Sequence, residues 1–455
     1  MTARPLLTVV LAAGKGTRMH SAAPKVLHAI AGRSMLGHVL ATAAGSAGSR
    51  VAVVVGPGMD AVAAQARRYV PDVEVFVQSE QLGTAHATLT ARSAIAAHDG
   101  PVIVLFADTP LFRPETLAAV RRSLESVEVA VVGFEAADPT GYGRLLRDAN
   151  GQLQAIREHG EATETERRET LCNGGVMGFQ AASMPGLLDR IGRDNAKQEY
   201  YLTDAVAAAR AAGLAMGIVG CPESEVLGIN SRDQLAAAEA IWQGRRRHEV
   251  MRAGATLIAP ETVWLAHDTL IGRDVVIEPN VFFGPGVVVE DGVLIKANSH
   301  IEGAHIRSGA IIGPFARLRP GADIGPNVHI GNFVEVKNAR LEEGAKANHL
   351  AYIGDGRVGA GANIGAGTIF CNYDGYSKHY TDVGRGAFIG SNSSLVAPVK
   401  IGDGAFVGSG SVITKDVAAD ALAVERSPQV EKPGWAGKFR TVMLRRKKER
   451  NAPDK

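Results

Sequence analysis

The chain has 455 residues, enough for two or three domains, and its 49 basic and 47 acidic residues leave a net charge of +2. This balance excludes a global field for nucleic acid or membranes, and no apolar run of about 18 residues is present to cross a bilayer. The cysteines have no CxxC spacing, which indicates a reducing, cytoplasmic compartment and argues against a structural zinc site. They are Cys172, Cys221 and Cys371.

The first predicted strand, residues 6–12, runs into the glycine-rich turn "GKGTR" at residues 14–18. The turn lacks the GxxxxGK[ST] pattern of a P-loop, and Met19 stands where a dinucleotide fingerprint needs its third glycine. A signal-peptide core does not fit either, because no small-residue cleavage site follows. Two interpretations of the turn remain. Either its backbone amides and the cations Lys15 and Arg18 bind an anion, or it is an ordinary turn between a strand and a helix.

The first half of the chain alternates short Val- and Leu-rich runs with helical stretches. The predicted strands are 6–12, 51–55, 73–77 and 102–106, and the predicted helices are 36–47, 61–69, 84–97 and 114–125. This alternation predicts an α/β, Rossmann-like domain over residues 1–233, with a parallel sheet covered by helices on both faces. Ligands bind at the carboxyl ends of such strands, where the glycine turn and Asp108 both lie.

Residues 234–254 are helix-forming and predict a linker, after which the period of the sequence changes. An aliphatic residue or Phe recurs every six positions from Ile271, slips by one residue at Ile306, and resumes at Val383 after an irregular stretch. A period of six matches the hexapeptide β-helix, in which each repeat is one short strand and a turn. We therefore predict a β-helix domain over residues 255–455 that ends in a basic tail.

The β-helix repeat is interrupted where polar residues concentrate, between Leu318 and Val383. The segment "IFCNYDGYSKHYTDVG" does not fit the repeat and must leave the helix as a loop. Loops that project from repeat arrays often carry binding sites. The basic tail has Lys438, Arg440, Arg445, Arg446, Lys447, Lys448 and Arg450, and a solvated, partly disordered segment is the favoured interpretation.

Several motifs of the first half resemble sugar-1-phosphate nucleotidyltransferases: "LAAGKGTRMHSAAPKVLHAIAG", "QLGTAHA", "ADTP", "PTGYGR", "EYYLTD" and "GIN". The second half adds "GPFARLRPG", "GNFVEVKNARL", "NHLAYIGD", "NIGAGTIFCNYDG" and "PVKIGDGAFVGSGSVIT". In order, from about residue 5 to 435, they resemble the bacterial bifunctional N-acetylglucosamine-1-phosphate uridyltransferase/glucosamine-1-phosphate N-acetyltransferase family. The resemblance implies a left-handed β-helix, a homotrimer, and synthesis of UDP-N-acetylglucosamine for the bacterial envelope.

For the uridyltransferase reaction, the resemblance implies a Mg²⁺-dependent attack of a sugar-1-phosphate on the α-phosphorus of UTP. Asp108 and Asn230 match the metal ligands, while Arg18 and Lys25 supply positive charge to the triphosphate. The matched nucleotide and sugar contacts also include Leu11, Ala12, Ala13, Gly14, Gln78, Gly83, Thr84, Gly143, Glu158, Asn173 and Thr203, with Tyr201 beside them. Ala85 and Gly174 depart from the family pattern.

For acetyl transfer from acetyl-CoA, the resemblance makes His349 the base that removes the proton of the amine. The residues that match the sugar-phosphate site are Arg319, Lys337, Tyr352, Asn363 and Lys378. The coenzyme contacts match Asn372, Tyr373, Ser391, Ser409 and Arg426. Arginine and lysine facing one phosphate dianion form a natural clamp.

Three other functions remain as alternatives. The first is a nucleotidyltransferase with a single activity, whose β-helix serves assembly or regulation. The second is a hexapeptide metalloenzyme with zinc on His300, His305 and His329, which lack a matching phase in the repeat. The third is a scaffold without catalysis, which would leave the matched Asp108 and His349 without a role.

Overall fold

The computed structural model describes residues 4–45, 48–195 and 197–450. Contacts between Cα atoms divide the chain into two compact units, Met1–Thr269 with Phe282–Pro285, and Leu270–Val281 with Gly286–Lys455. The predicted linker is largely helix α8 (Arg232–Arg252), which belongs to the first unit and holds Leu265 through both polar atoms of the Gln243 amide. The division at residues 233 and 254 stays a prediction.

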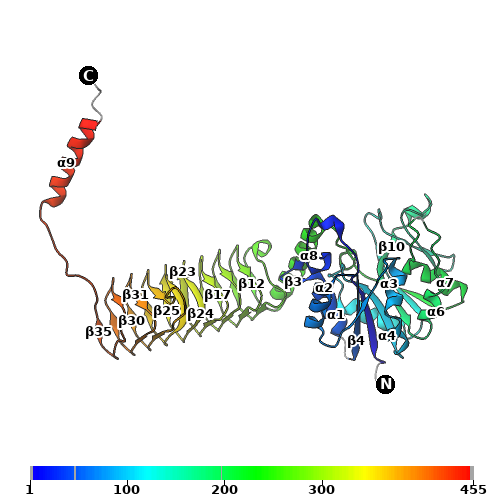
Figure 1. Ribbon diagram of the computed structural model, residues 1–455, viewed down its shortest axis with the longest axis horizontal. Helices are drawn as coiled ribbons and strands as arrows, with labels where there is room; N and C mark the ends of the chain where they lie inside the picture. Colours follow the sequence, from blue (N-terminus) through cyan, green and yellow to red (C-terminus); the bar gives the residue numbers. More distant parts are fainter. Residues whose placement is uncertain (1–3, 46–47, 196, 451–455) are drawn as a thin grey trace. The chain divides into compact units, whose positions relative to one another are not determined.

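The first unit is built on a mixed sheet with strand order β11-β7-β10-β6-β1-β4-β5 (Figure 1). These strands are β1 (Leu6–Leu11), β4 (Ser49–Val55), β5 (Glu74–Val77), β6 (Pro101–Phe106), β7 (Val129–Glu135), β10 (Leu171–Gln180) and β11 (Met216–Gly220). The four strands predicted from the sequence are parallel, as expected. A wholly parallel sheet was wrong, because β10 runs antiparallel to both β6 and β7.

Helices cover this sheet close to the predicted ranges. They are α1 (Met35–Ala44), α2 (Asp60–Tyr69), α3 (Thr84–Thr90), α4 (Arg92–Ala96), α5 (Pro114–Ser123), α6 (Met184–Leu188) and α7 (Ala205–Ala211). The single helix predicted at 84–97 is wrong, since the backbone leaves helical geometry at Ala91, which has φ −90° and ψ 19°. The predicted end of the first helix, at 46–47, lies outside the described residues.

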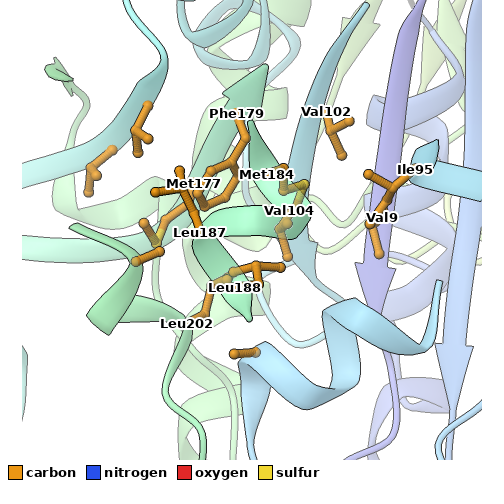
Figure 2. Packing of buried hydrophobic residues seen from close by; sticks show 14 of the residues in the cluster. Val9, Ile95, Val102, Val104, Met177, Phe179, Met184, Leu187, Leu188 and Leu202 are labelled. Carbon is orange, nitrogen blue, oxygen red and sulfur yellow. The ribbon is translucent and has the colours of Figure 1, made fainter. Parts of the chain in front are cut away.

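The alternation of the sheet's side chains explains why both faces are covered. Val9, Val104 and Phe179 point to one face and pack with Met184 and Leu188 of α6, as Figure 2 shows. Neighbouring positions of the same strands point to the opposite face, against α1, α2 and α5. Burial on both faces requires nearly continuous apolar strands, which is the pattern read from the sequence.

The second unit is a left-handed β-helix of short parallel strands that stack from coil to coil (Figure 1). One face contains β14 (Val276–Ile277), β17 (Leu294–Ile295), β20 (Ile311–Ile312), β23 (His329–Asn332), β25 (Lys346–His349), β27 (Asn363–Ile364), β30 (Phe388–Ile389), β33 (Phe406–Val407) and β35 (Leu422–Ala423). The other faces contain β13 (Leu270–Ile271), β16 (Val288–Val289), β18 (His300–Ile301), β19 (Ala304–Ile306), β21 (Arg317–Leu318), β22 (Ala322–Ile324), β24 (Glu335–Leu341), β26 (Tyr352–Val358), β28 (Ile369–Cys371), β29 (Thr381–Val383), β31 (Ser394–Val396), β32 (Val399–Ile401) and β34 (Val412–Ile413).

The six-residue repeat correctly identified the core of this unit. Ile295, Ile312 and Ile330 occupy one register and are fully buried. The stretch that looked irregular in sequence keeps the same inward positions, including Leu341, Ala347, Ile353, Val358, Ile364 and Phe370. The loop predicted over residues 369–384 is shorter than expected: β28 and β29 keep its two ends in the coil, and residues 372–380 between them leave it. The β-helix is therefore continuous through the polar region.

The basic tail forms helix α9 (Trp435–Arg450) rather than an irregular segment. The exposed residues of this helix include Trp435 and Phe439, whose rings stack with centroids 5.1 Å apart. Over the described residues, the structure contains no helix with the length and apolar character needed to cross a bilayer.

Candidate active sites

A pocket opens at the carboxyl ends of β1 and β6, where the sequence places ligand binding in a sheet of this kind. It is lined by Leu11, Ala12, Ala13, Gly14, Lys25, Val26, Gln78, Gln81, Gly83, Thr84, Ala87, Phe106, Asp108 and Glu199. Nearly all residues predicted to contact the nucleotide are therefore together. Lys15, Arg18 and Asn230 are not part of the lining, and Arg18 lies exposed on the short helix η1 (Thr17–Met19).

Lys25 joins the two predicted metal ligands. Its Nζ lies 2.5 Å from Asp108 Oδ2 and 2.9 Å from Asn230 Oδ1. The lysine side chain is only 7% exposed, whereas that of Asp108 is 23% exposed. Backbone contacts fix the pair of ligands, because Ile229 N donates to Asp108 O at 2.9 Å. A carboxylate oxygen and an amide oxygen thus converge on one cationic point at the floor of the pocket.

Gly16 allows Lys25 to reach this position. Gly16 has φ +62°, and a Cβ there would lie 2.4 Å from Lys25 Cβ. The glycine at this position of the turn is thus required both by its backbone conformation and by close packing.

We expect Gly16→Ala to destabilise the fold by about 1–2 kcal/mol, the cost of a left-handed L-residue. It should also lower nucleotidyl transfer at least about tenfold by moving Lys25. Denaturant unfolding and pyrophosphate release measure the two effects. Gly14→Ala is the control for stability, since nothing lies within 4 Å of a Cβ at Gly14. Equal destabilisation of both variants would contradict this explanation.

The predicted uracil-contacting stretch is held by its own hydrogen bonds. Gln78 is 3% exposed, and its Nε2 lies 3.2 Å from Gly83 O and 3.1 Å from His86 Nδ1. Gly83 has φ +112° and approaches the backbone of Tyr200 so closely that a Cβ would lie 2.5 Å from the Tyr200 oxygen. Ala85, one of the two departures, is buried, and its amide donates to that oxygen at 2.9 Å. The departure therefore lies in the core rather than at the pocket surface.

A second pocket adjoins the first and shares Thr84, Phe106 and Glu199 with it. Its other lining residues are Gly141, Glu158, His159, Gly160, Glu161, Asn173, Gly175, Met177, Lys197, Tyr201, Leu202 and Thr203. Four of these are residues predicted to hold or flank the sugar: Glu158, Asn173, Tyr201 and Thr203. Gly143 does not line it, but the Gly143 carbonyl accepts from Asn173 N at 2.8 Å.

The other departure, Gly174, lies where the pairing of β10 with β7 shifts register between Asn173 and Met177. A Cβ at Gly174 would lie 3.0 Å from Val226 and 3.1 Å from Val132, which is tight packing. Asn173 turns its side chain back, so that its Oδ1 accepts from Gly175 N at 3.0 Å. The bulge explains how this strand brings Asn173 to the second pocket.

Burial raises the pKa of Glu158 in this pocket, although the Thr203 hydroxyl donates to its Oε1 at 3.3 Å and partly opposes the shift. A glutamate whose pKa is raised by folding stabilises the folded protein, and this contribution is complete below the ordinary glutamate pKa of about 4.3. The contribution is lost as the pH rises through the raised pKa.

We therefore expect Glu158→Gln to raise the melting temperature at pH 7 but not at pH 4. Thermal unfolding at the two pH values measures this difference. Glu164→Gln, at an exposed position, is the control and should change neither value. A Glu158→Gln variant that is less stable than the wild type at pH 7 would refute the assignment.

In the β-helix, three predicted phosphate-binding cations come together on neighbouring coils. Arg319 directly follows β21, Lys337 lies in β24, and Lys378 comes from the loop at 372–380. Contact with the Lys378 ammonium lowers the pKa of Lys337, to which the charge of Arg319 also contributes. Arg319 is held by Glu335, with Nη1 2.8 Å from Oε1. The like charges of this cationic cluster favour an anion between them.

Asp355, which the sequence analysis did not identify, organises the floor of the cationic cluster. Its carboxylate accepts hydrogen bonds from Asn338 Nδ2, at 2.7 Å, and from Asn372 Nδ2, and lies 4.0 Å from Lys378 Nζ. Burial opposes its ionisation, but these hydrogen bonds and the lysine charges hold the pKa of Asp355 below its usual value. Gly354 makes room, since a Cβ there would lie 2.4 Å from the Tyr352 hydroxyl.

His349 lies at the end of β25, on a different face of the β-helix from β24 and β26. Its Nδ1 is 2.6 Å from Asn332 Oδ1. Because an amide oxygen can only accept, Nδ1 carries the hydrogen and Nε2 keeps its lone pair. Within the described residues, no hydrogen bond or ion pair joins His349 to the cationic cluster of Arg319, Lys337 and Lys378.

His349 and two predicted coenzyme contacts share one corner of the β-helix. Asn332, His349, Ala366, Ser391 and Ser409 occupy equivalent positions of successive coils, which we call the corner column. Backbone hydrogen bonds establish this: Leu350 N to Asn332 O (3.0 Å), Gly367 N to His349 O (3.2 Å), Asn392 N to Ala366 O (2.7 Å) and Gly410 N to Ser391 O (2.8 Å). Residues up to 77 positions apart in sequence are thus aligned in a row.

The remaining predicted residues surround these two groups. Asn363 begins β27, beside Lys346 of β25. Asn372 is buried against Asp355, while Tyr373 is 60% exposed and its hydroxyl donates to Gly375 O at 2.5 Å. Arg426 is exposed beyond the last strand, β35.

The structure also identifies residues that sequence reasoning missed. Gln81 lines the predicted nucleotide pocket and donates to Ala13 O, while Lys197 and Glu199 line the predicted sugar pocket. Gln81 lies within a quoted motif, which was a usable signal, but Lys197 precedes its motif and had none. Among the described residues, no three His, Cys, Asp or Glu side chains gather as a metal site, which is unfavourable for the alternative of a three-histidine zinc enzyme.

Comparisons with known proteins agree with this two-part organisation. Residues 8–170 match the MobA-like NTP transferase domain, and residues 268–303, 303–338 and 380–415 match the bacterial transferase hexapeptide model. The chain is 58% identical to Bifunctional protein GlmU of Bradyrhizobium sp. (strain ORS 278), over 98% of this chain and 100% of that protein. It is 60% identical to the protein of the same name from Azorhizobium caulinodans, over 97% and 99%. The chain therefore belongs to the GlmU family of bifunctional proteins, and it combines a nucleotidyltransferase with a hexapeptide N-acetyltransferase.

Proposed function

We propose that the first unit transfers the uridylyl group of UTP to N-acetylglucosamine-1-phosphate and releases pyrophosphate. The observation that carries this proposal is the pair of adjoining pockets that share Thr84, Phe106 and Glu199. One pocket has the glycine turn and the cation Lys25, which suit a triphosphate, and the other has the polar side chains suited to a sugar. Their common wall would hold the two reactants side by side, which is what in-line transfer requires.

The chemistry needs no general base, because the attacking phosphate oxygen is already an anion. A bond forms between that oxygen and the α-phosphorus, and the bond from the α-phosphorus to the bridging oxygen of pyrophosphate breaks. Lys25, at the floor of the pocket, would stabilise charge on the phosphates as it develops. Arg18, exposed on η1, would add positive charge near the outer phosphates.

We propose that Asp108 and Asn230 hold a Mg²⁺ ion. The fit rests on their oxygens, which both lie within 3 Å of one point, now filled by Lys25 Nζ. Two hard oxygen ligands, completed by water and phosphates, match the preference of Mg²⁺. When bound, the ion would neutralise phosphate charge. Lys25 would then turn from these ligands towards the nucleotide.

For the second unit, we propose acetyl transfer from acetyl-CoA to the amine of glucosamine-1-phosphate. Arg319, Lys337 and Lys378 would hold the phosphate, with Tyr352 and Asn363 on the sugar. His349 Nε2 would take one proton of the ammonium, after which the amine attacks the thioester carbonyl and the carbon–sulfur bond breaks. Coenzyme A leaves as the thiolate, which takes up the second proton released by the nitrogen. Ser391 and Ser409 of the corner column would lie along the coenzyme, with Asn372, Tyr373 and Arg426 near its ends.

We also propose a homotrimer, on the basis of a short apolar ridge beside the corner column: Phe333 follows Asn332, Leu350 follows His349, and Phe315 of the preceding coil stacks on Phe333. Phe315, Phe333 and Leu350 are 48%, 54% and 59% exposed and have left-handed φ angles of 55°, 57° and 53°. Other coils have Asn298 or Asn392 there, which tolerate this conformation. Bulky residues bear strain of order 1–3 kcal/mol in it. A second copy that covers the ridge would compensate for this cost, and would bring cations to His349 from a neighbouring chain.

Light scattering should therefore give three times the chain mass, and Phe333→Asn should shift the distribution towards smaller species. A monomeric wild type at micromolar concentration would refute the assembly.

We place this enzyme in the cytoplasm, where its three cysteines, all free, would remain reduced. Acetylation would come first, because its product is the acceptor for the uridylyl group.

Two assays on one preparation test the proposal. The first follows pyrophosphate release from UTP, Mg²⁺ and N-acetylglucosamine-1-phosphate, and the second follows free thiol from acetyl-CoA and glucosamine-1-phosphate. Both activities are expected. Pyrophosphate release without thiol release would instead support the alternative of a single-activity nucleotidyltransferase with a structural β-helix.

A further inference from the structure

The first unit contains another cavity, of about 260 Å³, that neither predicted site uses. Its walls come from β3 (Arg33–Ser34), α1, residues 110–115 and α8. None of its lining residues lines the nucleotide or sugar pocket. The charge of its wall is the unusual feature, because four arginines lie there with only two glutamates.

Both glutamates are already paired. Glu115 lies 3.2 Å from Arg113 Nε, and Glu249 lies 3.1 Å from Arg246 Nη1. Both side chains are more than half exposed, so these pairs are also weakened by solvent. Two positive charges of the wall are therefore left without a carboxylate.

These two charges belong to Arg33 and Arg245. Within the described residues, Arg33 has no ion pair and its Nε is buried without a hydrogen-bond partner, although its guanidinium lies 5.9 Å from the centre of the Tyr69 ring. Arg245 donates to neutral acceptors, Leu111 O at 3.0 Å and Ser224 Oγ at 2.7 Å. The charges of Glu225 and Glu249 reach Arg245 without forming an ion pair with it. Glu225 accepts from Thr116 and lies outside the wall, and Glu249 is paired with Arg246. Guanidinium groups that are partly buried and lack an anion favour a ligand that supplies one.

The rest of the lining limits what such a ligand can be. His38 is buried, its Nε2 lies 2.9 Å from Ile30 O, and burial lowers its pKa to about 4, so it adds no charge at neutral pH. Trp242 meets the His38 ring edge-on, with centroids 6.1 Å apart. The cavity thus pairs an excess of two positive charges with aromatic surface, which matches a phosphate dianion on a compact organic body.

We propose that this cavity binds an organic phosphate, separately from both predicted active sites. The segment from Asp108 to Pro114 connects it to the nucleotide pocket. Asp108, at one end, bonds Lys25, and Leu111, three residues on, accepts from Arg245. A phosphate that engages Arg245 acts on the same short segment that holds the predicted metal ligand, so the site is placed to regulate uridylyl transfer. That regulatory role rests on the proposed function, whereas binding itself does not.

Calorimetric titration of the full chain, with EDTA present to exclude Mg²⁺, tests binding. The probes are inorganic phosphate and two phosphate esters, glucose-6-phosphate and AMP. We expect saturable binding that Arg33→Gln weakens about tenfold or more, the effect of removing one charged hydrogen-bond partner. Arg33→Lys should restore part of it. Arg190→Gln, at an exposed arginine of the same unit, and Lys25→Ala, in the nucleotide pocket, should leave the affinity within about twofold of the wild type.

The outcomes separate clearly. Esters that bind more tightly than inorganic phosphate identify an organic ligand that uses the aromatic wall, as proposed. Equal affinity for all three probes would identify free phosphate as the ligand and overturn the proposal that the ligand is an organic phosphate. No saturable binding, or binding lost in Lys25→Ala and kept in Arg33→Gln, would overturn the site itself. Unfolding of each variant is checked by melting temperature. Failure of uridylyl transfer in the wild type would refute the proposed function without affecting these titrations.

Discussion

Replacing Asp108 by alanine is expected to lower pyrophosphate release by about 10²–10³-fold, the usual effect of removing one group that stabilises transition-state charge. The change removes a proposed Mg²⁺ ligand and the anionic partner of Lys25, 2.5 Å away. Without that partner the lysine would stay buried with only Asn230 as acceptor. The metal would lose a ligand, and the nucleotide phosphates would meet a misplaced cation. Thiol release from acetyl-CoA should stay within about twofold of the wild type, because the residues proposed for that reaction, including His349, lie in the other unit.

Two further variants make the Asp108 result specific. Asp108→Asn keeps the shape but removes the charge, and its pyrophosphate release should recover only in part at high Mg²⁺ concentration. Asp99→Ala removes an exposed carboxylate from the same unit and should have no effect. Mg²⁺ titrations at fixed UTP distinguish weaker metal binding from a slower step. Full activity of Asp108→Ala at ordinary Mg²⁺ concentrations would show that the metal lies elsewhere.

Replacing His349 by alanine is expected to reduce thiol release by about 10²–10⁴-fold, the range for loss of a general base. Pyrophosphate release should be unchanged. Asn332→Ala should have a smaller effect, about tenfold, since it removes the oxygen that holds Nδ1–H and leaves the ring free to turn. A change in the pH profile of Asn332→Ala would distinguish control of the imidazole from a general structural effect.

His329→Ala is the matched control for His349, because His329 lies on the same face of the β-helix, in the strand next to β25. It should retain both activities. If thiol release survived in His349→Ala with an unchanged pH profile, another residue would have to act as the base. The cationic cluster of Arg319, Lys337 and Lys378 contains only side chains that are ordinarily protonated and therefore offers no such base.

The sequence was most informative where one physical constraint recurs. Each coil must place an aliphatic side chain in a narrow core, so the six-residue period predicted Ile312 and Ile330 as buried. The same logic failed for the stretch after Leu341, where a single step of five residues, from Ile353 to Val358, broke the period and hid Val358 as an inward position. The antiparallel course of β10 left no trace in its composition, because direction depends on how long connections cross and not on local apolar content.

The candidate sites divide in a similar way. Residues in recognisable motifs, such as Lys25 and Asp108, were predicted by resemblance and are found together. Asp355, Gly354 and Asn332 were missed because each acts through a neighbour. Their roles depend on which side chain lies beside them on the adjacent coil. In this region, neighbouring positions on adjacent coils are 17 or 25 residues apart in sequence, and the sequence alone does not show which spacing applies because it does not give the loop lengths.

The stacking of the coils also determines where the β-helix unfolds first. Each coil contacts only the coil before and the coil after it, so local unfolding is easiest at a free end and hardest in the middle. His349 and Lys337 lie in interior coils, whereas Ser409 and Arg426 lie near the last strand, β35. Coenzyme bound across these coils would add its binding free energy to the weakest end. The substrate would then act as a terminal cap, and hydrogen exchange would slow first in the coils that fray most readily without it.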